Sequence, residues 1–400
     1  MLARLVPSLP IARPLASTSP GLASEMRKCL LRVAFRSSDA HRALAATSPL
    51  ALLGLTCHSL LERVERGALA GEPGPLWPQR VAELWDEILV QTCTAHPLAR
   101  ELGDPQRWPY YHLRRAQALR LALSIAKARS ESVASGDGRG SRPYVEWRMT
   151  GSAGRMQGRA DHILDEPGGV IIEDYKSGLI YEPSADDAAS PLVLKEDYRA
   201  QLLLYAALFH DETGTWPRAG RIVPLVGEPV TVPVQPEAAL DEVNQALTLL
   251  DRYNDLVARK GVTALSTPSA EACASCSFRG MCPAYWEQAE QSWQPRERPS
   301  AAGRVESIGD VRDGSWYMVL DVQSGTIDRG STRIIGLTTD QVTTPAGRIE
   351  PRWEARALPL RQSDAGTASQ LRAGPETEIW VVIERETEAP RGGSAGNVGG

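Results

Sequence analysis

The chain alternates between stretches in which hydrophobic residues recur every three or four positions and shorter stretches in which they alternate or run together. The first pattern is typical of amphipathic helices and the second of β-strands. It predicts helices over residues 21–35, 50–66, 79–102, 110–135, 195–210 and 240–260. It predicts strands over residues 143–150, 159–164, 170–176, 221–224 and 228–234. Residues 17–286 are therefore expected to form one domain with both kinds of element, after a disordered arm at residues 1–16.

The pattern changes after a polar linker, which we place at residues 287–303. Beyond it, short segments of alternating hydrophobicity are separated by Gly, Asp and Thr, at residues 316–322, 332–338, 352–360 and 378–384. This spacing predicts a small all-β domain of barrel or sandwich type over residues 304–388. An OB-like barrel that binds single strands is one option, although a fold alone does not establish a function. The Gly-rich end, residues 389–400, is expected to be disordered.

Composition and charge exclude some classes of protein. The content of 42% hydrophobic and 23% charged residues is ordinary for a soluble globular protein. The formal net charge of −5 argues against binding to nucleic acid through bulk positive charge, but 44 Lys and Arg residues suffice for a local basic channel. No apolar run approaches the roughly 18 residues of a membrane helix, and the first 24 residues lack the apolar core of a secretory signal. We therefore expect a cytoplasmic protein.

Residues 158–178, GRADHILDEPGGVIIEDYKSG, predict a β-hairpin that carries acidic residues and a lysine. Because strand side chains alternate between faces, Asp174 and Lys176 share one face and Glu173 points to the other. The hairpin returns Asp161 to the neighbourhood of Asp174. Two carboxylates suit a hard cation such as Mg²⁺, and a lysine beside them suits a water or a phosphate. The alternative is a surface hairpin with solvated charges.

Six cysteines in a chain without an export signal are expected to be reduced or metal-bound. Cys273, Cys276 and Cys282 have the spacing C-x-x-C-x-x-x-x-x-C, followed by proline, which indicates a metal site. A fourth ligand is needed, and Cys29 supplies it if the two distant segments meet. Four thiolates fit either Zn²⁺ or a [4Fe–4S] cluster. A disulfide or free thiols are the remaining alternative.

The order of these motifs resembles a known family. The series G-x-x-D, turn, buried strand and D-Y-K resembles the core of the PD-(D/E)XK nuclease superfamily. The closest branch looks like the RecB-type nucleases and the CRISPR-associated exonucleases with an iron–sulfur cluster. The form G-x-x-x-H at Gly54 and His58 and the form Q-x-x-x-Y at Gln201 and Tyr205 fall in the same order as in that family. The resemblance covers residues 17–285 and does not extend to the C-terminal β segments.

The resemblance implies a restriction-endonuclease-like α/β fold, in which helices flank a mixed central sheet, with a helical insertion between His58 and Asp161. It also implies a metal site. His58, Asp161 and Asp174 would bind Mg²⁺ or Mn²⁺, with the carbonyl of Tyr175 as a further ligand.

The same resemblance assigns roles to other residues. Lys176 would orient or activate the water, and Gln201 and Tyr205 would position the DNA strand. Cys29 would join the three C-terminal cysteines around a [4Fe–4S] cluster that is structural, with Zn²⁺ as the alternative. Glu146 stands where related nucleases sometimes carry an acid.

The helix over residues 110–135 is basic. Its candidates for the wall of a DNA channel are Arg114, Arg115 and Arg120. The alternative is a solvated helix face.

Three functional hypotheses follow. The leading one is a metal-dependent DNA nuclease, an exonuclease that prefers single strands, in DNA repair, recombination or phage defence. The second is a catalytically silent DNA-binding or scaffolding subunit that works with a helicase or a defence partner. The third is an interaction protein held together by zinc, with coincidental acids. The sequence contains no G-x-x-x-x-G-K-[ST] motif, so a helicase motor would lie on another chain.

Overall fold

The structure is a computed structural model that describes residues 2–96, 98–134, 144–182, 192–293, 298–311, 313–363 and 370–382. The chain divides into two compact units, Leu9–Phe278 and a second unit formed by Met1–Ser8 with Arg279–Gly400. The boundary lies before Arg279, whereas the sequence suggested a boundary after residue 286. The tail predicted at residues 389–400 lies outside the described residues.

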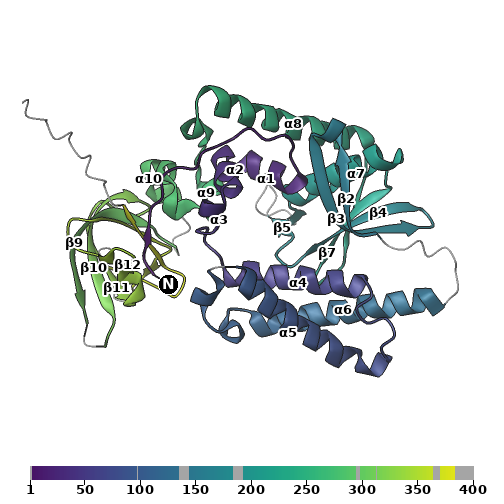
Figure 1. Cartoon of the computed structure of the whole chain (residues 1–400), viewed down its shortest axis with the longest axis horizontal. Coiled ribbons are helices and arrows are strands. Elements are labelled where there is room, and N and C mark those ends of the chain that lie inside the picture. Colours follow the sequence, from purple (N-terminus) through teal and green to yellow (C-terminus); the bar gives the residue numbers. More distant parts are fainter. Residues whose placement is uncertain are drawn as a thin grey trace, which may run out of the picture. The chain divides into compact units, whose positions relative to one another are not determined.

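A five-stranded sheet with the order β2-β3-β4-β7-β8 forms the centre of the larger unit (Figure 1). The strands β4 and β7 run parallel, and the other neighbours are antiparallel. A parallel pair needs a crossover connection, which a helix between the two strands supplies. The bounds are β2 Tyr144–Gly151, β3 Met156–Glu166, β4 Gly169–Lys176, β7 Ala219–Pro224 and β8 Val230–Pro233. The predicted mixed α/β fold is therefore confirmed.

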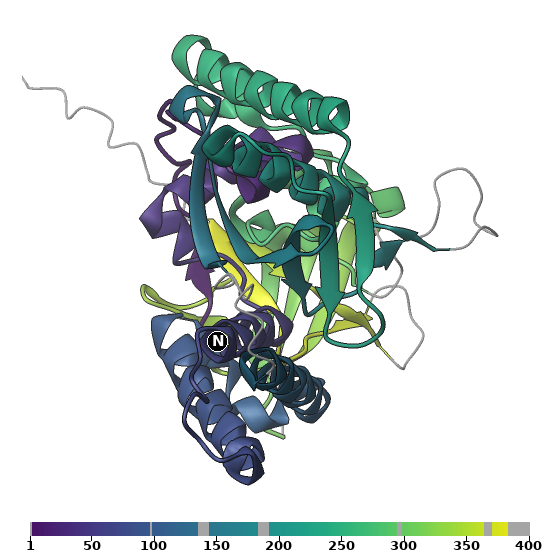
Figure 2. The ribbon, with the colours of Figure 1, turned by 90° about the vertical axis from the view of Figure 1, so that its right-hand side faces the viewer.

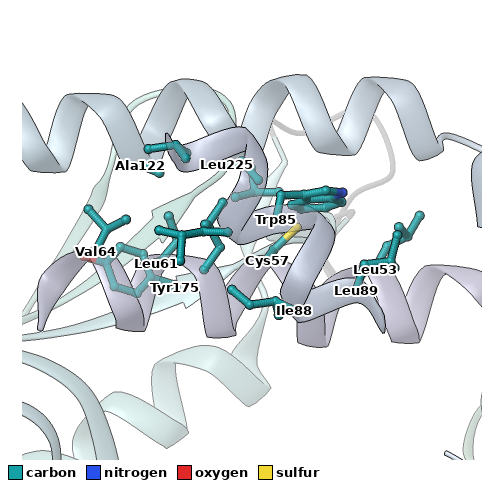
Figure 3. Close-up of a cluster of buried hydrophobic side chains, with 14 of the residues drawn as sticks. Leu53, Cys57, Leu61, Val64, Trp85, Ile88, Leu89, Ala122, Tyr175 and Leu225 are labelled. Atoms are coloured by element: carbon teal, nitrogen blue, oxygen red, sulfur yellow. The ribbon is translucent and has the colours of Figure 1, made fainter. Parts of the chain in front are cut away.

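Helices cover both faces of this sheet (Figures 1 and 2). On one face, Ile163 and Ile172 of the sheet share a buried core with Leu204 of α7. On the other face, α4, α5 and α6 enclose a core that Tyr175 and Leu225 enter from the sheet (Figure 3). The bounds are α4 Pro49–Glu65, α5 Trp77–Ala95, α6 Tyr111–Ala134, α7 Glu196–Thr213 and α8 Pro236–Arg259. Among the described helices, none combines the length and the apolar character needed to cross a membrane.

The segment predicted as one helix over residues 21–35 is broken at Cys29. This residue has an extended backbone, with φ −169° and ψ 123°. One extended residue interrupts the ladder of hydrogen bonds four residues apart, so the helix ends and a new one starts. The remaining helices of this unit are α1 Pro20–Lys28, α2 Leu30–Ser37, α3 Asp39–Arg42 and α9 Ala270–Ala274.

The smaller unit is rich in strands, as predicted for the C-terminal region. Its main sheet has the order β1-β17-β14-β9-β10-β11-β16-β15. Alternate residues of β10, among them Met318, Leu320 and Val322, are buried in its core. The bounds are β1 Arg4–Leu5, β9 Ala301–Asp310, β10 Trp316–Gly325, β11 Gly330–Leu337, β14 Glu354–Leu358, β15 Arg361–Gln362, β16 Gln370–Arg372 and β17 Glu378–Val382. A short helix, α10 Pro283–Gln288, and the strand pair β12 Thr343–Thr344 and β13 Gly347–Arg348 complete the unit.

The N-terminal arm is ordered where the sequence predicted disorder over residues 1–16. Arg4 and Leu5 form β1, which pairs in parallel with β17. The buried Arg4 guanidinium lies 3.1 Å from the Glu378 carboxylate and covers the ring of Trp380. The arm was mistaken for disorder because its hydrogen-bond and charge partners lie more than 370 residues further along the chain.

Candidate metal centre

The β3–β4 hairpin brings Asp161 and Asp174 together. The pairing of His162 with Glu173, continued by one residue, places the two aspartates opposite each other. The backbone N–H of Tyr175 donates a hydrogen bond of 2.9 Å to Asp161 Oδ2. Strand alternation then directs both carboxylates and Lys176 toward the face that α7 covers, and Glu173 toward the opposite face.

Lys176 connects the acidic pair to α7. Its Nζ lies 2.5 Å from Asp174 Oδ2 and donates a hydrogen bond of 2.8 Å to Gln201 Oε1. Its ammonium also lies 4.7 Å from the centre of the Tyr198 ring. Tyr205, one turn after Gln201, is buried beside it. The structure thus brings the predicted D-Y-K and Q-x-x-x-Y motifs to one place.

A glycine allows α7 to approach the hairpin this closely. A β-carbon on Gly158 would lie 2.6 Å from Leu208 Cδ1 and 3.1 Å from the ring of Tyr205. Any larger residue would push the helix, and Gln201 with it, away from Lys176. The glycine of the G-x-x-D motif therefore has a packing role.

His58 reaches the same place from α4. Its Nδ1 lies 3.6 Å from Asp161 Oδ2. Gly54, one turn earlier, lets α4 approach the end of β4, because a β-carbon there would lie 2.9 Å from Ser177 Oγ. The G-x-x-x-H motif thus supplies one close backbone approach, at Gly54, and one imidazole, at His58, both near the end of the β3–β4 hairpin.

The electrostatic environment separates the two aspartates. Burial would raise the pKa of Asp161, but His58, the Tyr175 N–H and Lys176 outweigh it and lower that pKa. The pKa of Asp174 is raised to about 6, mainly by burial. The positive charge of Lys176 lowers this pKa, and the negative charge of Asp161 raises it. Burial lowers the pKa of His58, yet its contact with Asp161 prevails and the pKa is raised. The site is therefore a compact group of coupled charges.

Glu146 adds a further carboxylate. It lies on β2 with a φ of 55°, a conformation that non-glycine residues adopt rarely and mostly at functional sites. Its side chain is mostly buried and forms an ion pair with Arg159. Burial and the nearby charges of Asp161 and Glu62 raise its pKa, while Arg159 lowers it. The structure thus brings Glu146 into the electrostatic neighbourhood of the acidic pair.

The donor atoms in this group suit a hard divalent cation. Two carboxylates and one imidazole lie near one another here, and magnesium and manganese accept oxygen and nitrogen ligands of this kind. Asp174 Oδ2 is a buried acceptor that makes no hydrogen bond, although the Lys176 ammonium is near. Within the described residues, no three His, Cys, Asp or Glu side chains are already arranged around one point as metal ligands. The residues therefore fit a metal by chemistry, with their charges balanced by His58 and Lys176.

A buried polar network lies on the opposite face of the hairpin, and the sequence motifs did not predict it. The Tyr175 hydroxyl donates a hydrogen bond of 2.9 Å to Glu65 Oε1 on α4. His162 Nδ1 lies 2.9 Å from Glu173 Oε2, and its Nε2 lies 3.6 Å from Glu65 Oε2. Arg221 of β7 donates a hydrogen bond of 2.9 Å to Glu173 Oε1. Glu65 follows His58 by two helical turns, so this network holds the helix of His58 against the strand of Asp174.

Tyr175→Phe is expected to weaken metal binding by about tenfold or more, because groups that orient metal ligands have effects of this size. Burial and the charge of Glu65 raise the Tyr175 pKa, so its hydroxyl remains a donor that the variant lacks. Calorimetric titration with Mn²⁺ would measure the change. Tyr253→Phe is the matched control, since the buried Tyr253 hydroxyl has no hydrogen-bond partner in the structure. Equal Mn²⁺ affinity in both variants would contradict the positioning role of the hydroxyl.

Three of the four predicted cysteine ligands, Cys29, Cys273 and Cys276, lie in the larger unit and interact electrostatically, without forming a ready metal site among the described residues. Cys29 Sγ accepts a hydrogen bond of 3.5 Å from the N–H of Thr267, shortly before Cys273 in the chain. Burial raises the pKa of Cys276 to about 11, and the neighbouring thiols of Cys273 and Cys29 raise it further, against the attraction of Arg32. The break between α1 and α2 thus delivers Cys29 to the C-x-x-C segment.

Cys282 belongs to the smaller unit, at the start of α10. The other two cysteines of the chain are separate. Cys57 is buried in the helical core, and burial raises its pKa to about 12. Cys93 packs against the same core.

The predicted basic wall makes contacts within the helical layer. Arg115 lies 3.6 Å from Asp86 of α5, and Arg114 donates to Gln117 at 3.4 Å. Arg120 is exposed. The structure does not bring these three arginines together with the acidic pair through any contact among the described residues. The local sequence showed their charge but not the partners that two of them find on neighbouring turns and helices.

Comparison with known proteins agrees with this fold. The model of the PD-(D/E)XK nuclease superfamily matches residues 17–283, more than half of the chain. A solved structure titled "Crystal structure of SSO0001" is similar at 16% sequence identity, covering 56% of this chain and 95% of that chain, with a TM-score of 0.20. No curated protein sequence matches the chain. Because that TM-score is low, the assignment rests on the family model. The chain therefore belongs to the PD-(D/E)XK nuclease superfamily, whose members are phosphodiester hydrolases that generally use divalent metals.

Proposed function

We propose that this protein is a Mg²⁺- or Mn²⁺-dependent deoxyribonuclease that digests single-stranded DNA from an end. The observation that carries the proposal is the meeting of Asp161, Asp174, Lys176 and His58 at the end of β4. Carboxylates and a neutral histidine bind the metal, and a lysine beside them handles a water or a phosphate oxygen. A solvated surface hairpin does not account for a site in which Asp174 is 2% exposed.

Each residue has a role in this proposal. Asp161, Asp174 and His58 hold the cation, and the carbonyl of Tyr175 is a further candidate ligand. The cation, when bound, supplies Lewis acidity toward the phosphate and its water. Lys176 holds the water or the phosphate oxygen, and Gln201 keeps the lysine in place through its 2.8 Å hydrogen bond. Tyr205, which packs against the hairpin, positions the strand.

The cysteine group has a structural role in the same proposal. Cys29, Cys273, Cys276 and Cys282 hold a [4Fe–4S] cluster, with Zn²⁺ as the alternative. The electrostatic effect of Cys29 and Cys273 on Cys276 supports a shared centre, because neighbouring thiols are stabilised as thiolates when a metal binds them. The combination of one distant cysteine with three clustered ones resembles the iron–sulfur nucleases, which favours iron over zinc.

End-labelled DNA tests this function directly. The anaerobically purified protein is incubated with single-stranded and duplex substrates in Mg²⁺, Mn²⁺ or EDTA. We expect cleavage in both metals, none in EDTA, and a ladder that shortens from one end of the single strand. A folded wild type that cuts neither substrate in either metal would overturn the proposal in favour of a silent DNA-binding subunit. A helicase or defence-system partner, a role in repair or phage defence and a cytoplasmic location stay predictions.

A further inference from the structure

Large hydrophobic side chains are exposed on the segment that follows Lys176. Leu179 is 79% exposed, Leu192 is 63% exposed and Tyr181 is 43% exposed. Each of these side chains lacks part of the stabilisation that full burial gives an apolar group. Exposed apolar surface beside a charged site is a feature of ligand-binding surfaces.

A small hairpin carries these side chains. β5 (Tyr181–Glu182) pairs with β6 (Val193–Leu194), with Tyr181 opposite Leu194, and the Lys195 N–H donates a hydrogen bond of 3.0 Å to the Ile180 carbonyl. Ile180 is buried with Leu202 and Ile222, and Leu194 packs against the same cluster. Val193 is 45% exposed. The hairpin is therefore anchored on the sheet through Ile180 and Leu194, while its other large apolar side chains remain exposed.

Two other elements near the acidic pair also carry exposed apolar side chains. Leu55 is 46% exposed on α4, three residues before His58. Val226 is 51% exposed and follows Leu225, whose N–H bonds the Lys176 carbonyl at 3.1 Å. We call Leu55, Leu179, Tyr181, Leu192 and Val226 the apolar rim.

The chain itself limits the distance between the rim and the reacting phosphate. Leu179 follows Lys176 by three residues, which span at most about 10 Å. Successive nucleotides of a stacked strand are about 3.4 Å apart. A strand with its phosphate at Lys176 therefore passes Leu179 within roughly three nucleotides.

We propose that the apolar rim binds the unpaired bases of a single strand next to the phosphate that is cut. The inference rests on the proposed nuclease function and names the surface that holds the bases of its single-stranded substrate. Apolar side chains offer nothing to a phosphate, but they pack against base faces. A duplex covers these faces by stacking, and a single strand leaves them accessible. Lys176 and Lys195 lie 4.7 Å and 5.6 Å from the ring centre of Tyr198 and supply positive charge for the backbone alongside.

The test is a binding measurement without cleavage. The double variant Leu179→Ala/Leu192→Ala is compared with wild type by fluorescence anisotropy, with labelled oligothymidylate of about 15 nucleotides in EDTA. We expect the affinity of the double variant to fall about tenfold, in line with the loss of one base contact. Leu240→Ala is the matched control, because Leu240 is 49% exposed on α8. It is expected to bind as wild type does.

An oligonucleotide that lacks bases separates base contacts from other causes. Wild type should bind an abasic strand of equal length about tenfold more weakly, and the double variant should lose nothing further. Unchanged affinity of the double variant for oligothymidylate would overturn the inference. So would an equal loss on both strands, or a changed oligomeric state with normal DNA binding, which would assign the rim to a protein partner. If the double variant does not fold, wild-type binding to the abasic strand decides alone.

The same experiments distinguish the two levels of the argument. If the wild type cuts DNA with metal but binds the abasic strand as tightly as oligothymidylate, the proposed function stands and only the role of the apolar rim is overturned. A wild type that neither binds nor cuts DNA overturns both.

Discussion

Asp174→Asn is expected to reduce cleavage by about a thousandfold or more, while the metal-free variant becomes more stable than wild type. The amide keeps the shape of the side chain but removes a negative charge from the metal site. Loss of one preorganised charge at a reacting phosphate costs two to three orders of magnitude, and weaker metal binding adds to it. The free energy of unfolding of the metal-free variant should increase, because the wild-type carboxylate is 2% exposed and burial disfavours its charge.

The stability difference should depend on pH in a defined direction. The folded-state pKa of Asp174 is about 6, above its ordinary value of 3.8. The folded state therefore binds this proton more tightly than the unfolded state does, and wild-type stability falls as the pH rises from about 4 to about 6. Above that range the variant should be more stable by about 1–3 kcal/mol, and below it the difference should vanish.

Urea unfolding in EDTA between pH 4 and pH 8 would measure this difference, and end-labelled DNA would measure cleavage. Asp241→Asn is the control, since Asp241 is exposed on α8. Its stability and activity should follow wild type. If Asp174→Asn cuts DNA as well as wild type does, the site assignment is wrong. If it is less stable at pH 8, the ion pair with Lys176 outweighs the burial of the carboxylate.

Cys276→Ser and Cys29→Ser should each abolish the visible absorbance and the bound iron, and lower the melting temperature by roughly 10 °C. Metal bound to a folded site contributes its binding free energy to folding, so a lost ligand destabilises the protein. The two cysteines are far apart in sequence, yet their thiols are close enough to interact electrostatically. Equal effects from the two substitutions are the specific expectation.

Iron, zinc and acid-labile sulfide analysis of the anaerobic protein, with melting curves, would measure these effects. Cys93→Ser is the control, because Cys93 packs against the helical core, to which none of the four predicted cysteine ligands belongs. If the wild type is colourless and contains one zinc ion, the four cysteines form a zinc site and the cluster assignment is wrong. A wild type without any metal, unaffected by Cys29→Ser, would contradict the shared centre.

Local patterns in the sequence accounted for most elements of the larger unit. The hairpin of β3 and β4 was predictable because turn residues and alternation act over neighbouring positions. The same alternation separated Asp174 from Glu173, and the structure shows their side chains in different contacts. The motif of Gly54 and His58 was recognised by resemblance, but the contact of Gly54 with Ser177 explains why that glycine is there.

The errors of the sequence analysis share a cause. The hydrophobic pattern of the predicted helix over residues 21–35 continues through Cys29. The helix nevertheless breaks there, where the Cys29 thiol makes hydrogen bonds with the backbone of Leu265 and Thr267. The N-terminal arm looked disordered because Arg4 finds Glu378 only in the fold. The DNA-channel role of Arg114 and Arg115 stays a prediction, and their contacts with Gln117 and Asp86 are a feature that the charge pattern did not show.

By itself the sequence determined most helices and strands of the larger unit, the family and the residue types at the acidic pair, because each depends on spacing along the chain. The tertiary structure alone decided which distant groups share an environment. Glu65, His162 and Glu173 form one buried network although they come from α4 and two strands. Burial also separates the pKa values of Asp161 and Asp174, two residues that look alike in sequence. Charge interactions and desolvation depend on distance in space, which spacing along the chain does not specify.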